Sequence, residues 1–120
     1  MWYHLYKKGG IMPIFDIHST DDINQKILTS KAAILVFHQP GCGACVLYEP
    51  SIDQMNDKYG VNGLVIIRVN VRENILFARD NQIHGTPTTL FYKDHKLVHR
   101  LEGYAPADVL ESQLKHFELI

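Results

Sequence analysis

Several features that mark large classes of protein are scarce or missing in this sequence. Its 120 residues contain only two cysteines, with no second paired cluster of Cys or His of the kind that a zinc site requires. Twelve Lys and Arg residues nearly balance thirteen Asp and Glu residues, and no basic patch indicates a nucleic-acid partner. No apolar run approaches the ~18–20 residues that a membrane-spanning helix needs. The N-terminus also lacks the apolar segment of a signal peptide, so we expect a cytoplasmic protein with no membrane partner.

The remaining composition is that of one globular domain. Hydrophobic residues make up 46% of the chain, and its length allows a core to be buried without disulfide staples. Residues 1–11 are aromatic and basic and precede a second methionine, Met12. They could form a flexible arm, an extra strand, or sequence upstream of a native start. We therefore expect an N-terminal extension over 1–11, one domain over 12–120, and a monomer.

Both cysteines lie where a predicted strand gives way to a predicted helix. The apolar run Ala32–Phe37 is typical of a buried strand. Apolar and aromatic side chains then recur at helical spacing, namely Tyr48, Ile52, Met55 and Tyr59. Free backbone N–H groups and the helix dipole favour an anion at such a junction, which indicates a thiolate on Cys42. Cys45 lies one turn further on and can reach Cys42 to close a disulfide.

This arrangement favours a dithiol redox centre over two other interpretations. The cysteines could be small buried apolar residues, or they could be half of a metal site completed by some of the seven histidines. The three-residue spacing and the strand–helix context favour the redox interpretation, and in the cytoplasm a cysteine pair is more often catalytic than structural. We expect no cofactor other than the Cys42–Cys45 disulfide itself.

The other segments alternate between strand and helix patterns. Short apolar runs predict strands at 14–18, 32–38, 64–71, 88–92 and 97–101. Helical patterns begin near Ser19, run from the cysteines to about Gly60, cover about 74–81, and follow Pro106. Three of the helices are expected to bury Ile23, Ile27 and Leu28; Ile75, Leu76 and Ala78; and Leu110, Leu114 and Phe117.

The lengths of the connections predict how the strands pair. The last two strands are joined by Lys93–Lys96 alone, which makes them an antiparallel hairpin, and the absence of an Asn-Gly pair there favours a turn of another type. The first three strands need helical crossovers, so we expect parallel or crossover pairing among them, with the hairpin as an antiparallel edge. The predicted fold class is therefore α/β, with a central mixed sheet flanked by helices.

Four features at matching spacings make residues 12–120 resemble the thioredoxin family. They are the Cys42–Cys45 motif, Pro50 inside the following helix, the loop at 85–88, and Gly103 after the last strand. The resemblance implies the thioredoxin fold, with helices on both faces of the sheet. It also implies a thiol–disulfide oxidoreductase that acts on protein disulfides and is supplied by a dithiol reductant or a reductase.

The resemblance assigns roles to named residues. Cys42 would attack a substrate sulfur, and Cys45 would then attack Cys42 and release the reduced substrate. The backbone N–H groups of Gly43 and Ala44, at the start of the helix, would donate hydrogen bonds to the thiolate.

The loop that the family places opposite the cysteines would hold the substrate. Pro87 would be cis, which brings the backbone of Thr86 beside the cysteines, where it could pair with an extended substrate segment. Proline would also leave no N–H of its own beside the disulfide.

Four positions depart from the family pattern. Gly41 replaces a tryptophan before the first cysteine, and Ala44 replaces a proline between the two cysteines. Val36 and Arg68 stand where well-known members have a buried aspartate and its lysine partner. These departures indicate a thioredoxin-like protein rather than a housekeeping thioredoxin, and they weaken the expectation that a standard thioredoxin reductase recognises it.

Two histidines and an arginine fall near the redox centre in this alignment. A cationic imidazole at His38 or His84 would favour the Cys42 thiolate, and Arg68 could tune the site in the same way. The alternative is that each histidine is an ordinary loop or surface residue. Because Val36 and Arg68 cannot accept a proton, Cys45 would depend on water or on a neighbour such as His38 to become a thiolate.

Three rival functions remain open at this stage. One is a glutathione-dependent glutaredoxin, against which the long segment after Pro87 and the lack of a Gly-Gly pair there both argue. Another is an interaction module with a thioredoxin fold, whose redox state only gates partner binding. The third is a metal-binding module, which the metal content of the reduced protein would reveal.

Overall fold

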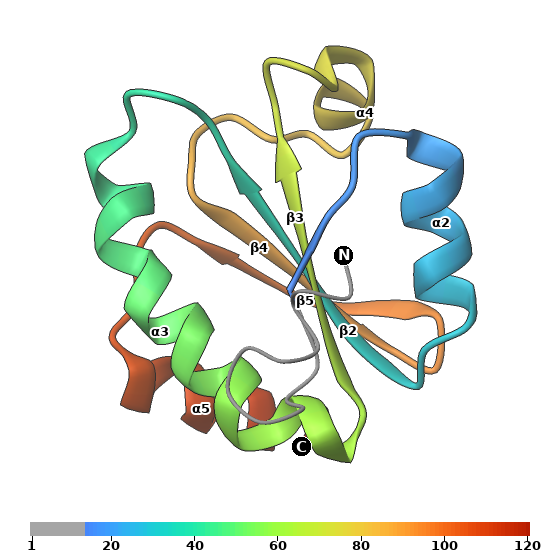
Figure 1. Cartoon of the computed structure of the whole chain (residues 1–120), viewed down its shortest axis with the longest axis vertical. Helices are drawn as coiled ribbons and strands as arrows, with labels where there is room; N and C mark the ends of the chain where they lie inside the picture. The colour runs from blue at the N-terminus through green and yellow to red at the C-terminus, as the bar shows by residue number, and fades with distance from the viewer. Residues whose placement is uncertain (1–13) are drawn as a thin grey trace, which may run out of the picture.

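The computed structural model describes residues 14–120, which form a five-stranded sheet with helices on both faces (Figure 1). The strands are β1 (Phe15–Asp16), β2 (Ala32–His38), β3 (Leu64–Asn70), β4 (Thr88–Lys93) and β5 (Lys96–Glu102). The helices are α2 (Thr20–Leu28), α3 (Gly43–Tyr59), α4 (Ile75–Asp80) and α5 (Ala107–His116), and a single 3-10 turn, η1 (Gly60–Asn62), follows α3. This order confirms the predicted alternation of strands and helices. The expected extension at 1–11 lies outside the described residues.

The sheet has the order β1-β3-β2-β4-β5. Strands β1 and β2 pair in parallel with β3, whereas β4 pairs antiparallel with both β2 and β5. The mixed sheet and its antiparallel hairpin are therefore confirmed. Strand β2 lies at the centre and is buried from Ala32 to Phe37, as expected of a strand covered on both faces.

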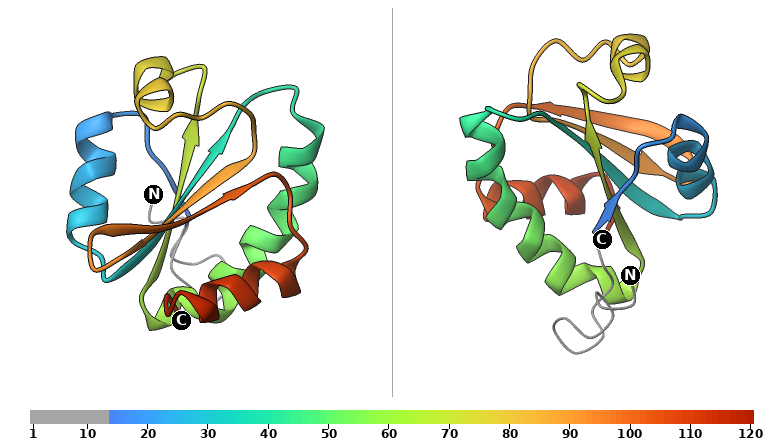
Figure 2. Two further views of the ribbon diagram at one scale, coloured as in Figure 1. Left: turned by 180° about the vertical axis from the view of Figure 1, so that it is seen from behind. Right: turned by 45° about the horizontal axis from the view of Figure 1, so that its top comes forward.

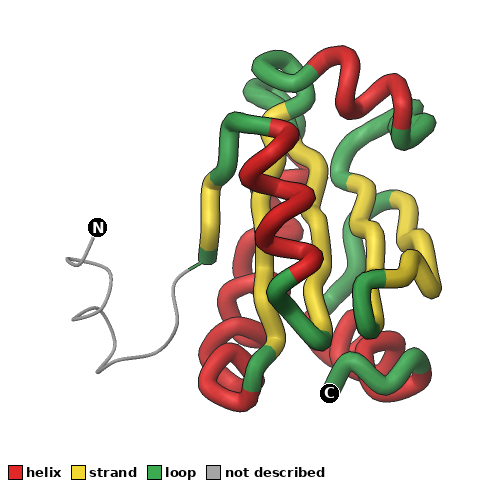
Figure 3. Tube along the Cα trace, turned by 90° about the vertical axis from the view of Figure 1, so that its right-hand side faces the viewer, coloured by secondary structure: helices red, strands yellow, loops and turns green. Residues whose placement is uncertain are grey.

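Side chains that alternate along β2 contribute to two separate cores. Ile34 and Val36 pack with the buried residues of α3 and α5. Leu35 and Phe37 pack with those of α2 and α4 on the opposite face. In Figure 3 α2 lies in front of the strands with α3 and α5 behind them, and Figure 2 shows α3 and α5 side by side. The face that carries α3 is also the one on which Cys45, in the first turn of α3, lies.

Two of the predicted helix faces are partly wrong. Leu28 is 58% exposed, although Ile23 and Ile27 of the same helix are buried. In α4 only Ala78 is buried, and Ile75 and Leu76 are 67% and 62% exposed. Helix α4 has only six residues, so a single narrow face meets the sheet, and that face excludes its first two side chains. In α5 the predicted residues Leu110 and Leu114 are buried and Phe117 packs against them.

The turn between β4 and β5 also differs from the prediction. Asp94 and His95 both have positive φ angles, 49° and 72°, which is the signature of a type I′ hairpin turn. The expectation of another turn type is therefore wrong. Aspartate and histidine are among the residues that tolerate this left-handed conformation best. A residue from another segment also stabilises the turn, because the N–H of Asp94 donates to the carbonyl of Lys31, just before β2, at 2.8 Å.

Candidate active site

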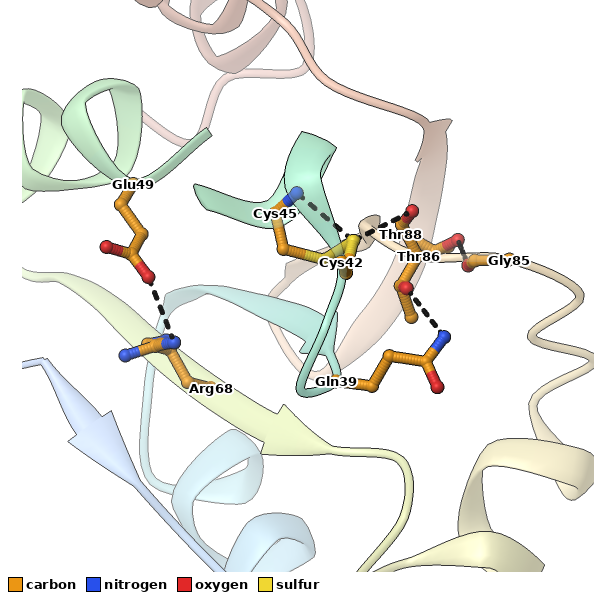
Figure 4. The surroundings of a disulfide bond; sticks show 8 residues. All are labelled: Gln39, Cys42, Cys45, Glu49, Arg68, Gly85, Thr86 and Thr88. Carbon is orange, nitrogen blue, oxygen red and sulfur yellow. Dashed lines mark hydrogen bonds and ion pairs between the residues drawn. A yellow bond between two sulfur atoms is a disulfide. The ribbon is translucent and has the colours of Figure 1, made fainter. Parts of the chain in front are cut away.

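The two cysteines are placed by the change from β2 to α3. Strand β2 ends at His38, a short loop follows, and α3 begins at Gly43 with Cys42 as its N-cap. The N–H of Cys45 donates to Sγ of Cys42 at 3.1 Å (Figure 4). The first turn of α3 therefore directs a backbone donor at the sulfur, as the sequence predicts. The donor is the amide of Cys45 itself, whereas the sequence pointed to those of Gly43 and Ala44.

The two sulfurs form a disulfide, and they differ in exposure. The Cα atoms of Cys42 and Cys45 lie 5.3 Å apart, within the usual range for a disulfide. Cys42 is partly exposed, whereas only 8% of Cys45 is exposed. An incoming sulfur can therefore approach Cys42 more readily than Cys45.

The loop before β4 lies against the exposed cysteine. The peptide bond between Thr86 and Pro87 is cis, as the resemblance implies. The carbonyl oxygen of Thr86 lies 3.4 Å from Sγ of Cys42, so backbone groups and the reactive sulfur share one surface (Figure 4). The N–H of Gly103 donates to the carbonyl of Pro87 at 2.8 Å and ties the end of β5 to this loop.

A side-chain hydrogen bond joins the loop between β2 and α3, residues 39–42 and hereafter the redox loop, to the loop before β4. Nε2 of Gln39 donates to Oγ1 of Thr86 at 2.9 Å, as Figure 4 shows. The sequence did not predict a role for Gln39, because its partner lies 47 residues away and the neighbouring residues do not indicate the contact. Its position in the loop just before Cys42 was the only available signal.

Val36 and Arg68 face each other across the β2–β3 pair. They are direct register partners, and Val36 is only 4% exposed. The guanidinium of Arg68 lies 3.7 Å from a carboxylate oxygen of Glu49 and 3.8 Å from one of Asp16. Glu49 stands one helical turn after Cys45 and was also missed, because a glutamate on a helix is usually a solvated surface residue. A paired charge network thus lies beside the site.

A cavity of about 300 Å³ borders the disulfide on the side of α3. Its walls are formed by the redox loop, the first two turns of α3 and the ends of β2 and β3. The lining residues are His38, Gln39, Pro40, Gly41, Cys42, Cys45, Val46, Glu49, Arg68 and Asn70.

His38 is the titratable ring in this cavity. Burial and the nearby Arg68 guanidinium lower the pKa of His38 from its usual value of 6.5. The imidazole is therefore mainly neutral at pH 7 in this oxidised form, whereas the expectation of a cationic ring that favours the Cys42 thiolate concerns the reduced protein. His84 is exposed and lies outside the cavity, so the structure does not bring it together with His38.

Two other kinds of site are absent from residues 14–120. No three or more His, Cys, Asp and Glu side chains come together there in a way that could hold a metal ion. None of the helices in this part of the chain has the length and apolar character to cross a bilayer.

Comparison with known proteins gives consistent matches. Residues 20–118 match the family described as thioredoxin-like domain. Thioredoxin 1 of Synechococcus elongatus is 32% identical over 77% of this chain and 87% of its own length. Thioredoxin 2 of Plasmodium berghei is 29% identical over 87% of this chain, but the match covers only 66% of that protein. The solution structure of oxidised thioredoxin from Plasmodium falciparum superposes with a TM-score of 0.76 at 23% identity, covering 88% of this chain and 98% of that one.

Proposed function

Because the chain belongs to the thioredoxin-like family, we propose that it is a thiol–disulfide oxidoreductase that acts on the disulfides of other proteins. The observation that carries this proposal is the proximity of a partly exposed sulfur to the backbone of Thr86, which is also partly exposed. Sγ of Cys42 lies 3.4 Å from the carbonyl oxygen of Thr86. An extended substrate segment that pairs with the backbone at Thr86 would bring its own disulfide to Cys42.

The reaction transfers two electrons in two exchange steps. The Cys42 thiolate attacks one sulfur of a substrate disulfide, the substrate S–S bond breaks, and the other substrate sulfur leaves as a thiolate. Cys45 then attacks Sγ of Cys42, the bond to the substrate breaks, and the Cys42–Cys45 disulfide forms. The substrate gains two electrons and the protein loses two. A dithiol reductant or a reductase must restore the reduced state, and we place this cycle in the cytoplasm.

The N-terminus of α3 supports the first step. The N–H of Cys45 already points at Sγ of Cys42, at 3.1 Å, and the same donor would stabilise a thiolate there. Little rearrangement is then needed between the oxidised and the reduced protein. Cys45, being buried, is shielded from substrates and left free to resolve the mixed disulfide.

The test is the reduction of insulin disulfides with dithiothreitol as the electron donor. We expect the protein to accelerate insulin reduction, and the Cys42→Ala variant to show no more than the uncatalysed rate. Equal rates for the protein and the variant would rule out the proposed oxidoreductase activity. A partner that binds Cys42→Ser as well as the unaltered protein would instead favour the interaction module.

A further inference from the structure

The last α3-facing side chains of β2 and β3 come together beside Cys45. Successive side chains on a strand alternate between faces, and Val36 packs into the core beneath α3 and α5. His38 lies two residues further, about 7 Å along β2, and points to the same face. Arg68 and Asn70 are the register partners of Val36 and His38 on β3. The ends of these two strands therefore carry polar groups where the first turns of α3 begin.

The cavity connects His38 with the resolving cysteine. Both His38 and Cys45 line it, and its volume of about 300 Å³ is enough for several waters at about 30 Å³ each. A proton can pass between two groups directly or through one water. Cys45 is only 8% exposed, so bulk water reaches its sulfur poorly and the cavity provides the access.

We propose that His38 is the proton acceptor that converts Cys45 into a thiolate when the mixed disulfide is resolved. The proton moves from Sγ of Cys45 to an imidazole nitrogen of His38. The Cys45 thiolate attacks Sγ of Cys42, and the bond between Cys42 and the substrate breaks. The substrate sulfur leaves with the electron pair and takes a proton from the imidazolium or from water. This step rests on the proposed oxidoreductase function.

No other group in the cavity is as well suited to accept this proton. Arg68 is permanently charged and has donors only, and Val36 beside it has no polar atom. Glu49 is the one carboxylate in the cavity lining, but its oxygen lies 3.7 Å from the Arg68 guanidinium and its side chain is 53% exposed. A carboxylate is in general a weaker base at neutral pH than an imidazole.

The charges around His38 keep the ring in the accepting form. Burial and Arg68 of β3 lower the pKa of His38, while Asp16 of β1, Glu49 of α3 and Glu73 after β3 raise it. The lowering effects are the stronger ones, so the ring is neutral and open to a proton at pH 7.

The test is a single-turnover experiment with a disulfide-containing peptide, which separates attack from resolution. Reduced protein is mixed with the peptide, quenched with acid at set times, and the mixed disulfide is followed by mass spectrometry from pH 5 to 9. In His38→Gln we expect attack to be retained and resolution to slow about 10²-fold at pH 7, the lower end of general-base effects. The inflection that the titration of His38 gives to the pH profile of the resolution rate should also disappear.

Glu49→Gln provides a second measurement that leaves His38 in place. Because the Glu49 carboxylate raises the pKa of His38, its removal should move the inflection of the resolution rate to lower pH without abolishing resolution. His116→Gln, an exposed histidine of α5, is the matched control and should change neither phase.

Three results would overturn the role of His38. They are an unchanged resolution rate in His38→Gln, an inflection that persists in that variant, and loss of resolution in Glu49→Gln. A protein that forms no mixed disulfide at all would instead contradict the oxidoreductase function itself, because attack precedes resolution.

Discussion

At the scale of single residues, the contact between Gln39 and Thr86 joins the two loops that border Cys42. Nε2 of Gln39 donates to Oγ1 of Thr86 at 2.9 Å and so links the loop before Cys42 to the loop before β4. We expect that loss of this bond lets the two loops move apart while both cysteines stay in place. With the proposed function, the contact would then act in substrate binding rather than in the chemistry.

We predict that Gln39→Leu raises KM for a protein disulfide by about 2- to 10-fold, equivalent to the roughly 0.5–1.5 kcal/mol of one hydrogen bond, with little change in kcat. Thr86→Val should have a similar effect, and the double variant should be no worse than either single one. Insulin reduction at varied insulin concentration measures this. Additive losses in the double variant would show that the two side chains act independently.

The sequence predicted the residues of the site that belong to a local pattern. Cys42 and Cys45 were recognisable from their spacing at a strand–helix junction, and Pro87 from its resemblance to a family loop. Gln39 and Glu49 were not predictable, because their roles depend on partners on other segments. His38 was identified, but the lowering of its pKa was not, since its burial and the position of Arg68 follow only from the fold.

At the scale of elements, we expect the first turn of α3 to influence the balance between the dithiol and the disulfide. Ala44 is the second residue of this helix, and N–H groups in a first turn have no partner within the helix. The amide of Cys45 already donates to Sγ of Cys42, and the amide of Ala44, in the same first turn, can add a second donor once Cys42 is a thiolate. Proline fits the backbone of a first turn but lacks the N–H.

We predict that Ala44→Pro makes the redox potential more reducing, by about 30 mV for each ~1.4 kcal/mol of thiolate stabilisation that is lost. Equilibration of the protein against glutathione buffers measures the potential. Ala107→Pro, in the first turn of α5 and away from the cysteines, is the control and should leave the potential unchanged. A potential that stays the same in Ala44→Pro, or becomes more oxidising, would show that this N–H does not stabilise the thiolate.

Element positions were more predictable than element faces. Strand β2 covers the predicted residues 32–38, because a short apolar run between polar segments is typical of a buried strand. Leu28 and Leu76 are exposed despite their apolar character, since only the tertiary arrangement determines how much of a short helix meets the sheet. The type I′ turn at Asp94 and His95 was missed because these residues are less typical of it than Asn-Gly.

At the scale of the whole molecule, buried polar groups limit the pH range of stability. Tyr48 of α3 is almost fully buried, and its hydroxyl lies 2.8 Å from Oγ1 of the buried Thr89 on β4. Burial raises the pKa of Tyr48 from 10.0 to about 12. Between these two values the unfolded chain loses the proton and the folded protein keeps it. The contribution of neutral Tyr48 to the free energy of unfolding is therefore fully present below pH 10 and is lost as the pH rises toward 12.

We predict that Tyr48→Phe flattens this alkaline loss, which amounts to about 2–3 kcal/mol for a shift of this size. At pH 7 the variant should be less stable by about 0.5–1.5 kcal/mol, because Thr89 loses its hydrogen-bond partner. Urea unfolding at pH 7 and at pH 10–11.5 measures both effects. The variant would contradict the account if its stability fell with pH as steeply as that of the unaltered protein.

The central claim is that Cys42 attacks the substrate disulfide and Cys45 resolves the mixed disulfide. Trapping of the mixed disulfide tests this claim most directly. Cys45→Ser and Cys42→Ser are each mixed with the same disulfide-containing peptide, and the covalent adduct is measured by mass spectrometry. We predict a stable adduct of one peptide per protein for Cys45→Ser, because the partly exposed Cys42 attacks and cannot be displaced. For Cys42→Ser we predict adduct formation at least about tenfold slower, because the remaining sulfur is buried. Equal rates in the two variants, or no adduct with Cys45→Ser, would contradict the account.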